Sequence, residues 1–230
     1  NINKIATIRN ARSGDYPNVV EAAINCQKFG ADGITIHPRP DERHITKKDV
    51  YDIKSIIDTE YNIEGYPSED FIKMVIDVKP EQVTLVPDKP DTITSCAGWD
   101  TVRYQAYLKD IISVLKQNRI RTSIFVEADI EMVQGAKECG CDRIELYTED
   151  YANSYILNKK RAIAPYLEAA IKATHLKLAI NAGHDLNLEN LEYFAKEMPE
   201  LAEVSIGHAL ISDSIYLGLE NTIQMYKRLL

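Results

Sequence analysis

The stretch Gly33-Ile34-Thr35-Ile36-His37 is a short, mostly apolar run that ends in a histidine. Two later runs end in the same way: Leu178-Ala179-Ile180-Asn181-Ala182-Gly183 precedes His184, and Val204-Ser205-Ile206-Gly207 precedes His208. Runs of this length and composition predict β-strands. Titratable residues at the carboxyl ends of successive strands are typical of the working face of a (β/α)8 barrel, so these runs predict that fold.

Strand and helix patterns alternate along the whole chain. Strand-like runs lie at residues 1–5, 33–37, 61–65, 82–86, 122–126, 143–148, 178–182 and 203–206. Helical patterns lie near residues 18–29, 47–57, 69–78, 101–118, 130–138, 159–175, 188–197 and 210–228. Such alternation favours a parallel sheet, and eight units favour its closure. We therefore predict an α/β fold, a (β/α)8 TIM barrel, with residues 1–230 as one domain and the active site at the carboxyl ends of the strands.

Composition narrows the class of protein. A length of 230 residues suits one domain, and a net charge of −8 argues against a general nucleic-acid surface. No apolar stretch approaches the roughly 20 residues of a membrane span, and no signal peptide is visible, so we expect a cytoplasmic protein without a membrane partner. The chain begins at Asn1 without Met, on an expected strand, and we expect residues upstream of it.

The four cysteines are expected to be reduced and structural. Cys139-Gly140-Cys141 does not have CxxC spacing, and its glycine is typical of a helix end. Metal binding is the lesser alternative. We expect no metal and no cofactor.

Polar residues inside the expected strands predict a polar lumen. They are flanked by apolar neighbours that would face the helices, and they are Asn1, Asn3, Thr35, Asn62, Glu64, Glu145 and Asn181. A single residue of this kind is typical of a solvated rim with satisfied hydrogen bonds. A set this large on one face favours a polar cavity, because unpaired polar groups are costly in a barrel interior.

Two carboxylates of this set are candidates for catalysis. Glu64 ends the strand Asn62-Ile63-Glu64-Gly65, where partial burial would raise its pKa and suit a general base. The alternative is a structural ion pair with a neighbouring Arg or Lys. Glu145 lies deeper, and it would either stabilise positive charge on a reacting nitrogen or orient a His or Lys.

Three loops have the composition of anion-binding sites. Residues 37–44 hold Arg39, suited to bidentate phosphate contacts, and His44 as a second donor, although a solvated charged loop is the alternative. Arg12 precedes Ser-Gly and is a plausible anion ligand. The Gly-His pairs after the last two strands match the phosphate site of many barrels. The long segment 87–99 is expected to act as a lid.

Several motifs together resemble a known family. They lie in order at residues 1–12, 30–37, 41–45, 83–87, 181–184 and 206–209, and they resemble the pyridoxine 5′-phosphate synthase family. The resemblance implies a metal-free cytoplasmic (β/α)8 barrel that forms a homo-octamer. It also implies condensation of 3-amino-2-oxopropyl phosphate with 1-deoxy-D-xylulose 5-phosphate to pyridoxine 5′-phosphate, inorganic phosphate and water, the ring-closing step of vitamin B6 synthesis.

The resemblance also implies roles at matching positions. For catalysis it implies proton acceptors at His37 and Glu64, a proton donor at His184 and a transition-state stabiliser at Glu145. Contacts to 3-amino-2-oxopropyl phosphate are implied for Asn1, Arg12, Gly207 and His208. Contacts to the sugar phosphate are implied for Arg39, His44 and Thr94.

Two positions depart from the family pattern. Asn3-Lys4 stands where the family usually has Asp-His, so Lys4 keeps a donor for a substrate oxygen but loses the imidazole. Asp185 stands where the family has Gly after the proton-donating His. We expect the amide of Asp185 to reach a phosphate, with its carboxylate pointing away. All three residues are kept as candidate substrate-binding positions.

Three other functions remain open at this point. The first is another phosphosugar barrel enzyme, an aldolase (lyase) or isomerase, with Lys4 as a Schiff-base candidate. The second is metal-dependent hydrolysis through the histidines, although no HxH or HExxH spacing supports it. The third is a barrel that only binds a phosphorylated metabolite, against which the presence of Glu64 beside His37 and His184 argues.

Overall fold

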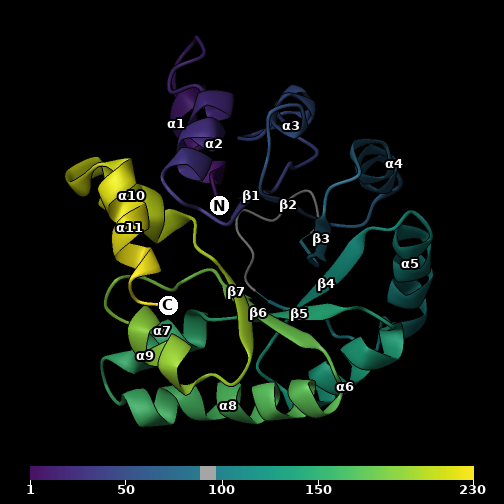
Figure 1. The fold of residues 1–230 in the computed structure, drawn as a ribbon. Coiled ribbons are helices and arrows are strands. Elements are labelled where there is room, and N and C mark those ends of the chain that lie inside the picture. Colours follow the sequence, from purple (N-terminus) through teal and green to yellow (C-terminus); the bar gives the residue numbers. More distant parts are fainter. Residues whose placement is uncertain (89–96) are drawn as a thin grey trace.

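In the computed structural model, which describes residues 1–88 and 97–230, seven strands form one parallel sheet in the order of the sequence. They are β1 (Gly33–Ile36), β2 (Glu60–Gly65), β3 (Gln82–Leu85), β4 (Arg121–Val126), β5 (Arg143–Tyr147), β6 (Ala179–Gly183) and β7 (Leu201–Ser205). The sheet curls so that the strands gather at the centre, with helices around them (Figure 1). The predicted α/β TIM-barrel class is confirmed.

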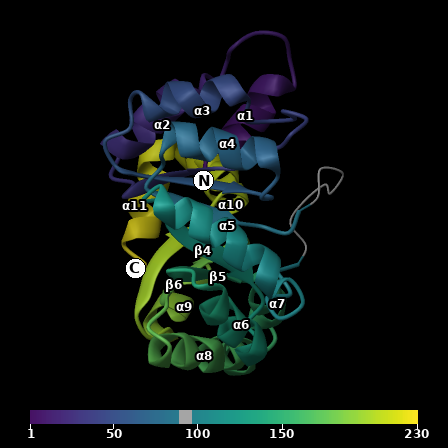
Figure 2. The ribbon, with the colours of Figure 1, turned by 90° about the vertical axis from the view of Figure 1, so that its right-hand side faces the viewer.

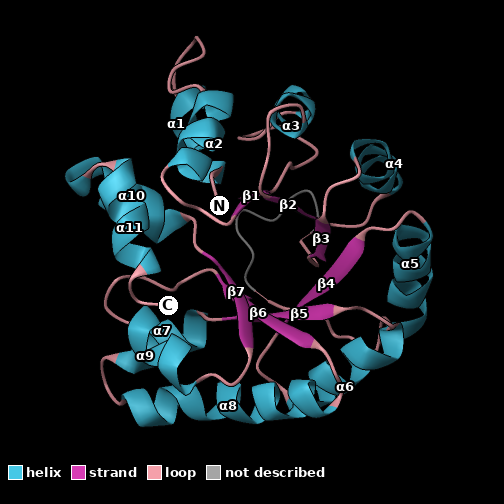
Figure 3. Ribbon diagram, in the orientation of Figure 1, coloured by secondary structure: helices cyan, strands magenta, loops and turns pink. Residues whose placement is uncertain are grey.

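The helices form the outer layer (Figure 2, Figure 3). Within the described residues they are α1 (Asn3–Asn10), α2 (Val19–Lys28), α3 (Lys47–Lys54), α4 (Glu69–Val78), α5 (Gln105–Gln117), α6 (Ile130–Cys139), α7 (Glu149–Tyr155), α8 (Lys159–His175), α9 (Leu191–Glu197), α10 (His208–Leu217) and α11 (Leu219–Lys227). Helix α8 lies across the sheet from α1, α2 and α3. None of these helices has the length and apolar character needed to span a bilayer.

The predicted strand at residues 1–5 is wrong, because helix α1 begins at Asn3. The buried side chains there are Ile2, Ala6 and Arg9, spaced by four and three residues, which is the period of a helix. The first two residues still bridge the open side of the sheet. The Asn1 nitrogen donates to the Ile206 carbonyl at 3.0 Å, and the Ile2 amide donates to the Thr35 carbonyl at 3.1 Å.

Two further helical details differ from expectation. The single helix expected over 210–228 is two helices, α10 and α11, separated at Gly218, whose φ of +79° suits glycine. Helix α7 was not predicted. Side-chain caps begin several of the other helices: Thr46 and Asp49 form a full capping box, and Ser68 and Asp129 accept first-turn amides.

Polar side chains do face the lumen, as predicted. Asn62 on β2 donates to Thr35 on β1 at 3.4 Å and accepts from Thr84 on β3 at 3.1 Å. Across the barrel, Asn181 on β6 donates to Glu203 on β7 at 3.2 Å. Their apolar neighbours along each strand belong to the hydrophobic core under the helices. Alternation along the strands therefore separates a polar lumen from an apolar outer layer.

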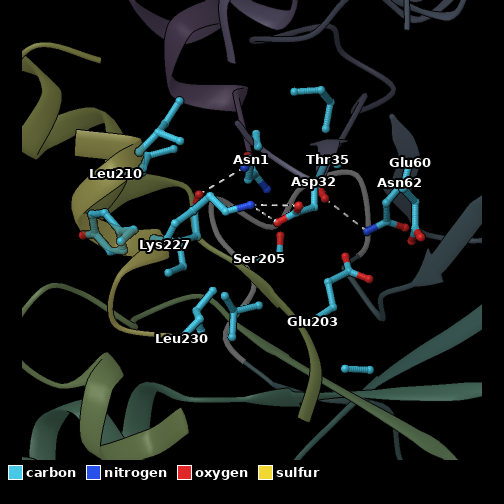
Figure 4. A pocket seen from close by; sticks show the side chains of 18 of the residues that line it. Asn1, Asp32, Thr35, Glu60, Asn62, Glu203, Ser205, Leu210, Lys227 and Leu230 are labelled. Atoms are coloured by element: carbon cyan, nitrogen blue, oxygen red, sulfur yellow. Dashed lines mark hydrogen bonds and ion pairs between the residues drawn. The ribbon is translucent and has the colours of Figure 1, made fainter. Parts of the chain in front are cut away.

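The amino ends of the strands are tied together by charge. Arg121 pairs with Glu60, and Arg143 contacts Glu203 at 2.8 Å. A cavity of about 320 Å³ lies between the β7 and β1 sides of this end (Figure 4). Lys227 closes one edge of it through an ion pair with Asp32 at 2.7 Å.

Candidate functional site

A second cavity of about 400 Å³ opens at the carboxyl ends of the strands. Here it is called the rim cavity, and it is lined by Asn1, Asn3, Lys4, His37, Arg39, His44, Glu64, Glu145, Tyr147, Glu149, His184, Asp185, Ser205, Gly207 and His208. All the predicted site residues line it except Arg12 and Thr94. Arg12 is exposed beyond the end of α1, away from this lining. Thr94 lies outside the described residues, as does most of the segment expected to act as a lid.

His37 and Glu64 meet at the centre of the rim cavity. His37 follows β1 and Glu64 lies near the end of β2, which pairs with β1, so the sheet register brings them together. The His37 Nδ1 and Glu64 Oε2 atoms are 3.9 Å apart. Asn3 Oδ1 accepts the His37 main-chain amide at 2.8 Å, which holds the start of this loop.

Burial gives these two groups unusual proton affinities. It raises the pKa of Glu64 to about 7, against the lowering effect of His184. Burial, with a smaller contribution from the Arg39 charge, holds the pKa of His37 well below its usual range. Near neutral pH, His37 is therefore an uncharged imidazole able to accept a proton, and Glu64 is close to half ionised.

Glu145 lies deeper, on β5. Burial and the nearby Glu64 charge raise the pKa of Glu145 well above the ordinary value, which favours its protonated form. Within the described part of the chain its Oε2 atom is buried without a hydrogen-bond partner. Gly183 allows this approach, because a Cβ there would lie 2.8 Å from Glu145 Oε1. A neutral carboxyl group can donate a hydrogen bond to a reacting oxygen or nitrogen.

His184 occupies a strained position at the end of β6. Its φ of +104° is rare for a residue with a side chain, and its amide donates to the Ser205 carbonyl of β7 at 3.4 Å. The ring contacts Phe125 and Tyr147, with centroids 5.8 Å and 5.3 Å away. Burial lowers the pKa of His184, but Asp185 and Glu64 outweigh it and raise the pKa above the ordinary value.

The loop after β1 carries two candidate phosphate ligands. Arg39 is buried and pairs with Asp88 at 2.7 Å. His44 Nδ1 accepts the Ile45 amide at 2.9 Å, and burial lowers the pKa of His44 to about 4. The neutral His44 ring must then carry its proton on Nε2, which makes that atom a hydrogen-bond donor.

Arg9 fixes the far end of this loop. Its guanidinium makes a bidentate pair with Asp49 at 2.6 Å and 2.9 Å, and it donates to the His44 carbonyl at 3.0 Å. Of the two arginines that follow the first residues of the chain, Arg9 is therefore structural and Arg12 is exposed.

Gly207 and His208 begin helix α10 at the opposite side of the rim cavity. The first amides of a helix point outward and favour an anion. A Cβ at Gly207 would lie 3.1 Å from the Asn1 Cγ atom, tighter than ordinary contact. Glycine therefore keeps the helix start close to Asn1.

Four residues near this site were missed by the sequence analysis. Tyr147, Glu149 and Ser205 line the rim cavity, and Asp88 pairs with Arg39. Their signal was the one used for the histidines, namely a polar residue at or just after a strand end. Within residues 1–88 and 97–230, no group of three or more His, Cys, Asp or Glu side chains is placed to hold a metal ion.

The whole chain resembles known proteins. The family model described as "Pyridoxal phosphate biosynthesis protein PdxJ" matches residues 1–230. The pyridoxine 5′-phosphate synthase of Bacteroides thetaiotaomicron is 59% identical over 230 residues, which is 100% of this chain and 97% of that protein. That of Cytophaga hutchinsonii is 59% identical over 228 residues, 99% of this chain and 96% of that protein.

More distant structures share the fold alone. The thiamine phosphate pyrophosphorylase from Pyrococcus furiosus superposes with a TM-score of 0.63 at 11% identity, over 94% of this chain and 90% of that one. The family model matches every residue, and two relatives are close to 60% identical. Family membership is therefore shown by sequence similarity and does not rest on likeness of fold. The chain belongs to the PdxJ family of pyridoxal phosphate biosynthesis proteins.

Proposed function

We propose that this chain is a pyridoxine 5′-phosphate synthase, which condenses 3-amino-2-oxopropyl phosphate with 1-deoxy-D-xylulose 5-phosphate. The observation that carries the proposal is the meeting of His37, Glu64 and His184 in one rim cavity with different proton affinities. The reaction releases inorganic phosphate and water while a ring closes and becomes aromatic. Each of these steps moves protons, so several acid and base groups are useful.

The protonation states assign the roles. Neutral His37 and the ionised form of Glu64 accept protons from the condensing substrates, and protonated His184 donates one to a leaving oxygen. Glu145, whose raised pKa favours the protonated form, donates a hydrogen bond that stabilises charge developing in the transition state. Glu64 near its midpoint at neutral pH can both take and return a proton within one cycle.

Two anion grips hold the two phosphates. The first comprises the amides at the start of α10 with Gly207, His208 and the side chain of Asn1, and it binds 3-amino-2-oxopropyl phosphate. The second comprises Arg39 and the Nε2 donor of His44, and it binds the sugar phosphate.

The remaining candidates concern the same two substrates. Arg12 and Thr94 stay candidate phosphate ligands through the family resemblance alone, because Arg12 is exposed away from the rim cavity and Thr94 lies outside the described residues. Asn3 and Lys4 bind substrate oxygens between the two grips, and Asp185 lies beside the first grip.

The protein is further proposed to be cytoplasmic, to form one domain over residues 1–230, and to assemble as a homo-octamer. Ile215 and Tyr216 on α10 support self-association, because their side chains are 69% and 88% exposed in the single chain. Sedimentation of the purified protein would measure the oligomer.

The test of the proposed function is an assay with both phosphorylated substrates. Product absorbance and released inorganic phosphate should appear together in a 1:1 ratio, and neither should appear when one substrate is left out. Turnover should continue after treatment with a metal chelator. Phosphate release with one substrate alone, or no pyridoxine 5′-phosphate with both, would overturn the proposal.

An aldolase is the second candidate, because Lys4 lines the rim cavity. Borohydride reduction in the presence of the sugar phosphate distinguishes the two functions. A stable adduct on Lys4 would favour the aldolase, and a wild-type protein without such an adduct but with product formation would favour the synthase.

A further inference from the structure

The carboxylate of Asp185 lies beside the ring of its neighbour His184. Its Oδ2 atom lies 3.7 Å from His184 Nδ1. This separation exceeds hydrogen-bond length, so the attraction is between a carboxylate and an imidazolium charge. His184 follows the last residue of β6, and its φ of +104° lies outside the extended conformation of a strand.

The surroundings of Asp185 Oδ2 strengthen its attraction to a charged His184 ring. The atom is buried, and within the described residues it has no hydrogen-bond partner. A buried carboxylate oxygen without a partner is costly unless an opposite charge lies nearby. The imidazolium of His184 is such a charge, so the buried oxygen favours the protonated form of that ring.

The main chain of Asp185 is fixed on both sides. Its amide donates to Thr148 Oγ1 at 3.3 Å, and its carbonyl accepts from Asn190 Nδ2 at 3.2 Å. Thr148 Oγ1 in turn donates to the Gly183 carbonyl at 2.8 Å, one residue before His184. The amide expected to reach a phosphate is therefore already bonded within the protein, and the carboxylate is held against the ring.

We propose that Asp185 is a positioning residue that keeps His184 protonated and oriented for proton donation in the rim cavity. This inference rests on the proposed function, in which His184 is the proton donor.

Other groups face the same ring and must be counted. Glu64 from β2 and Asp88 after β3 also attract the imidazolium, and the Asp185 contact adds to them. His37 after β1 is neutral, and Tyr147 from β5 presents its ring at 89°. Glu64 changes its own charge as it accepts a proton, whereas Asp185 lies outside the proposed proton path. Asp185 can therefore hold His184 charged at the moment when Glu64 has been neutralised.

The direct test is titration of His184 by NMR in the full chain with labelled histidine. The chain has five histidines, and loss of one signal in His184→Gln assigns it. In Asp185→Asn the midpoint of His184 should fall by about 0.5 to 1 pH unit, the size expected for a carboxylate at this separation. Above the midpoint, this lowers the protonated fraction about 3- to 10-fold.

Activity provides the second readout. In Asp185→Asn the alkaline limb of the kcat profile should move to lower pH. KM for both substrates should change less than kcat. Asp185→Glu keeps a carboxylate, so its alkaline limb should return most of the way to the wild-type pH. Glu189→Gln is the matched control, because it removes an exposed carboxylate of the same loop and should leave both the midpoint and the limb in place.

The outcomes separate the two proposals. An unchanged His184 midpoint in Asp185→Asn would overturn this inference, as would an equal shift in Glu189→Gln. If Asp185→Asn does not fold, Asp185→Gly, with the residue usual in the family, is titrated in its place with the same two readings. A third outcome is possible, in which the His184 midpoint shifts in Asp185→Asn but the wild-type protein makes no product. That outcome would overturn the proposed function and leave the inference about the Asp185–His184 contact standing.

Discussion

Two histidines of the rim cavity differ in charge because their surroundings differ. His37 is 8% exposed at its side chain and lies near Arg39, so burial and a like charge both keep it neutral. His184 is 38% exposed and has two carboxylates nearby, Asp185 and Glu64, which hold it protonated. A site needs both an acceptor and a donor, and here one residue type supplies both at the same pH.

The rate of the wild-type protein should depend on pH in a bell-shaped manner. Glu64 must be ionised to accept a proton, so kcat/KM should fall as the pH drops through about 7. His184 must be protonated to donate, so kcat/KM should also fall as the pH rises above the raised pKa of His184. A steady-state profile from pH 3.5 to 9.5 measures both limbs. An acid limb near pH 4.5, the ordinary range for Glu, would contradict the assignment of Glu64.

Replacing Glu64 by Gln should stabilise the fold at neutral and alkaline pH. The pKa of Glu64 is higher in the folded state than in the unfolded chain, so the folded state binds this proton more tightly. The contribution to stability is present below pH 4.5 and is lost as the pH rises through about 7. Glutamine cannot ionise, so the stability of the variant does not fall for this reason as the pH rises.

Urea unfolding of wild type and Glu64→Gln at pH 5 and pH 8 makes the comparison. The variant should gain on the order of 3 kcal/mol relative to wild type between the two pH values, from a pKa displaced from 4.5 to about 7. A difference that stays constant with pH would show that Glu64 ionises as readily in the fold as in the unfolded chain.

At the scale of elements, α1 and α3 are joined through one carboxylate. Asp49 completes the capping box of α3 with Thr46, and the same side chain pairs with Arg9 from α1. This junction holds the loop that carries Arg39 and His44. The position of the second phosphate grip therefore depends on a helix cap that begins two residues after His44.

Loss of the α3 cap and loss of the Arg9–Asp49 ion pair should lower the free energy of unfolding by different amounts. Thr46→Ala should lower the unfolding free energy by about 1 kcal/mol, the usual value for a lost cap. Asp49→Ala should lower it by about 3–5 kcal/mol, because it leaves the buried Arg9 charge without its partner. Urea denaturation of both variants tests this order, and equal small losses would mean that Arg9 finds water or another acceptor.

Replacing Gly207 at the start of α10 by alanine should leave the fold intact but weaken substrate binding. At Gly207 the φ of −116° is open to alanine, but the added Cβ would press on Asn1. Gly207→Ala should raise KM for 3-amino-2-oxopropyl phosphate about tenfold, equivalent to about 1.4 kcal/mol of binding, with less effect on the sugar phosphate. Equal changes in the two KM values would place the first grip elsewhere.

At the scale of the whole molecule, the two ends of the barrel have different chemistry. The amino ends of the strands carry paired charges, such as Arg121 with Glu60 and Arg143 with Glu203. The carboxyl ends carry groups whose proton affinities are displaced and that line an open cavity. At the amino ends opposite charges are paired, although burial also raises the pKa of Glu203 there, while the histidines and carboxylates with displaced pKa values at the carboxyl ends line an open cavity and suit proton transfer.

Much of this arrangement follows from local patterns in the sequence. Alternation within each strand predicted the polar lumen, and strand ends predicted where His37, Glu64 and His184 would meet. The strand expected at residues 1–5 failed because a five-residue alternation also fits one turn and a half of helix, and burial of Ala6 and Arg9 decides between them. Local pattern is therefore sufficient for the barrel but not for every element.

Contacts between separate loops could not be predicted in this way. Asp88 follows β3 and Arg39 follows β1, and they meet across the end of β2 although 49 residues separate them in the chain. The contact between the Asp185 carboxylate and the His184 ring depends on the local backbone and side-chain torsions after β6, and no sequence pattern reports it. Proton affinities depend on burial, which is likewise a property of the assembled barrel.

The most direct test of the central claim, that Glu64 and the rim histidines transfer the protons of the condensation, is the turnover of Glu64→Gln with both substrates. The substitution keeps the size of the side chain and removes only its ability to take a proton. The account predicts a fall in kcat of at least about 100-fold, with circular dichroism unchanged. Turnover close to that of wild type in the folded variant would contradict it.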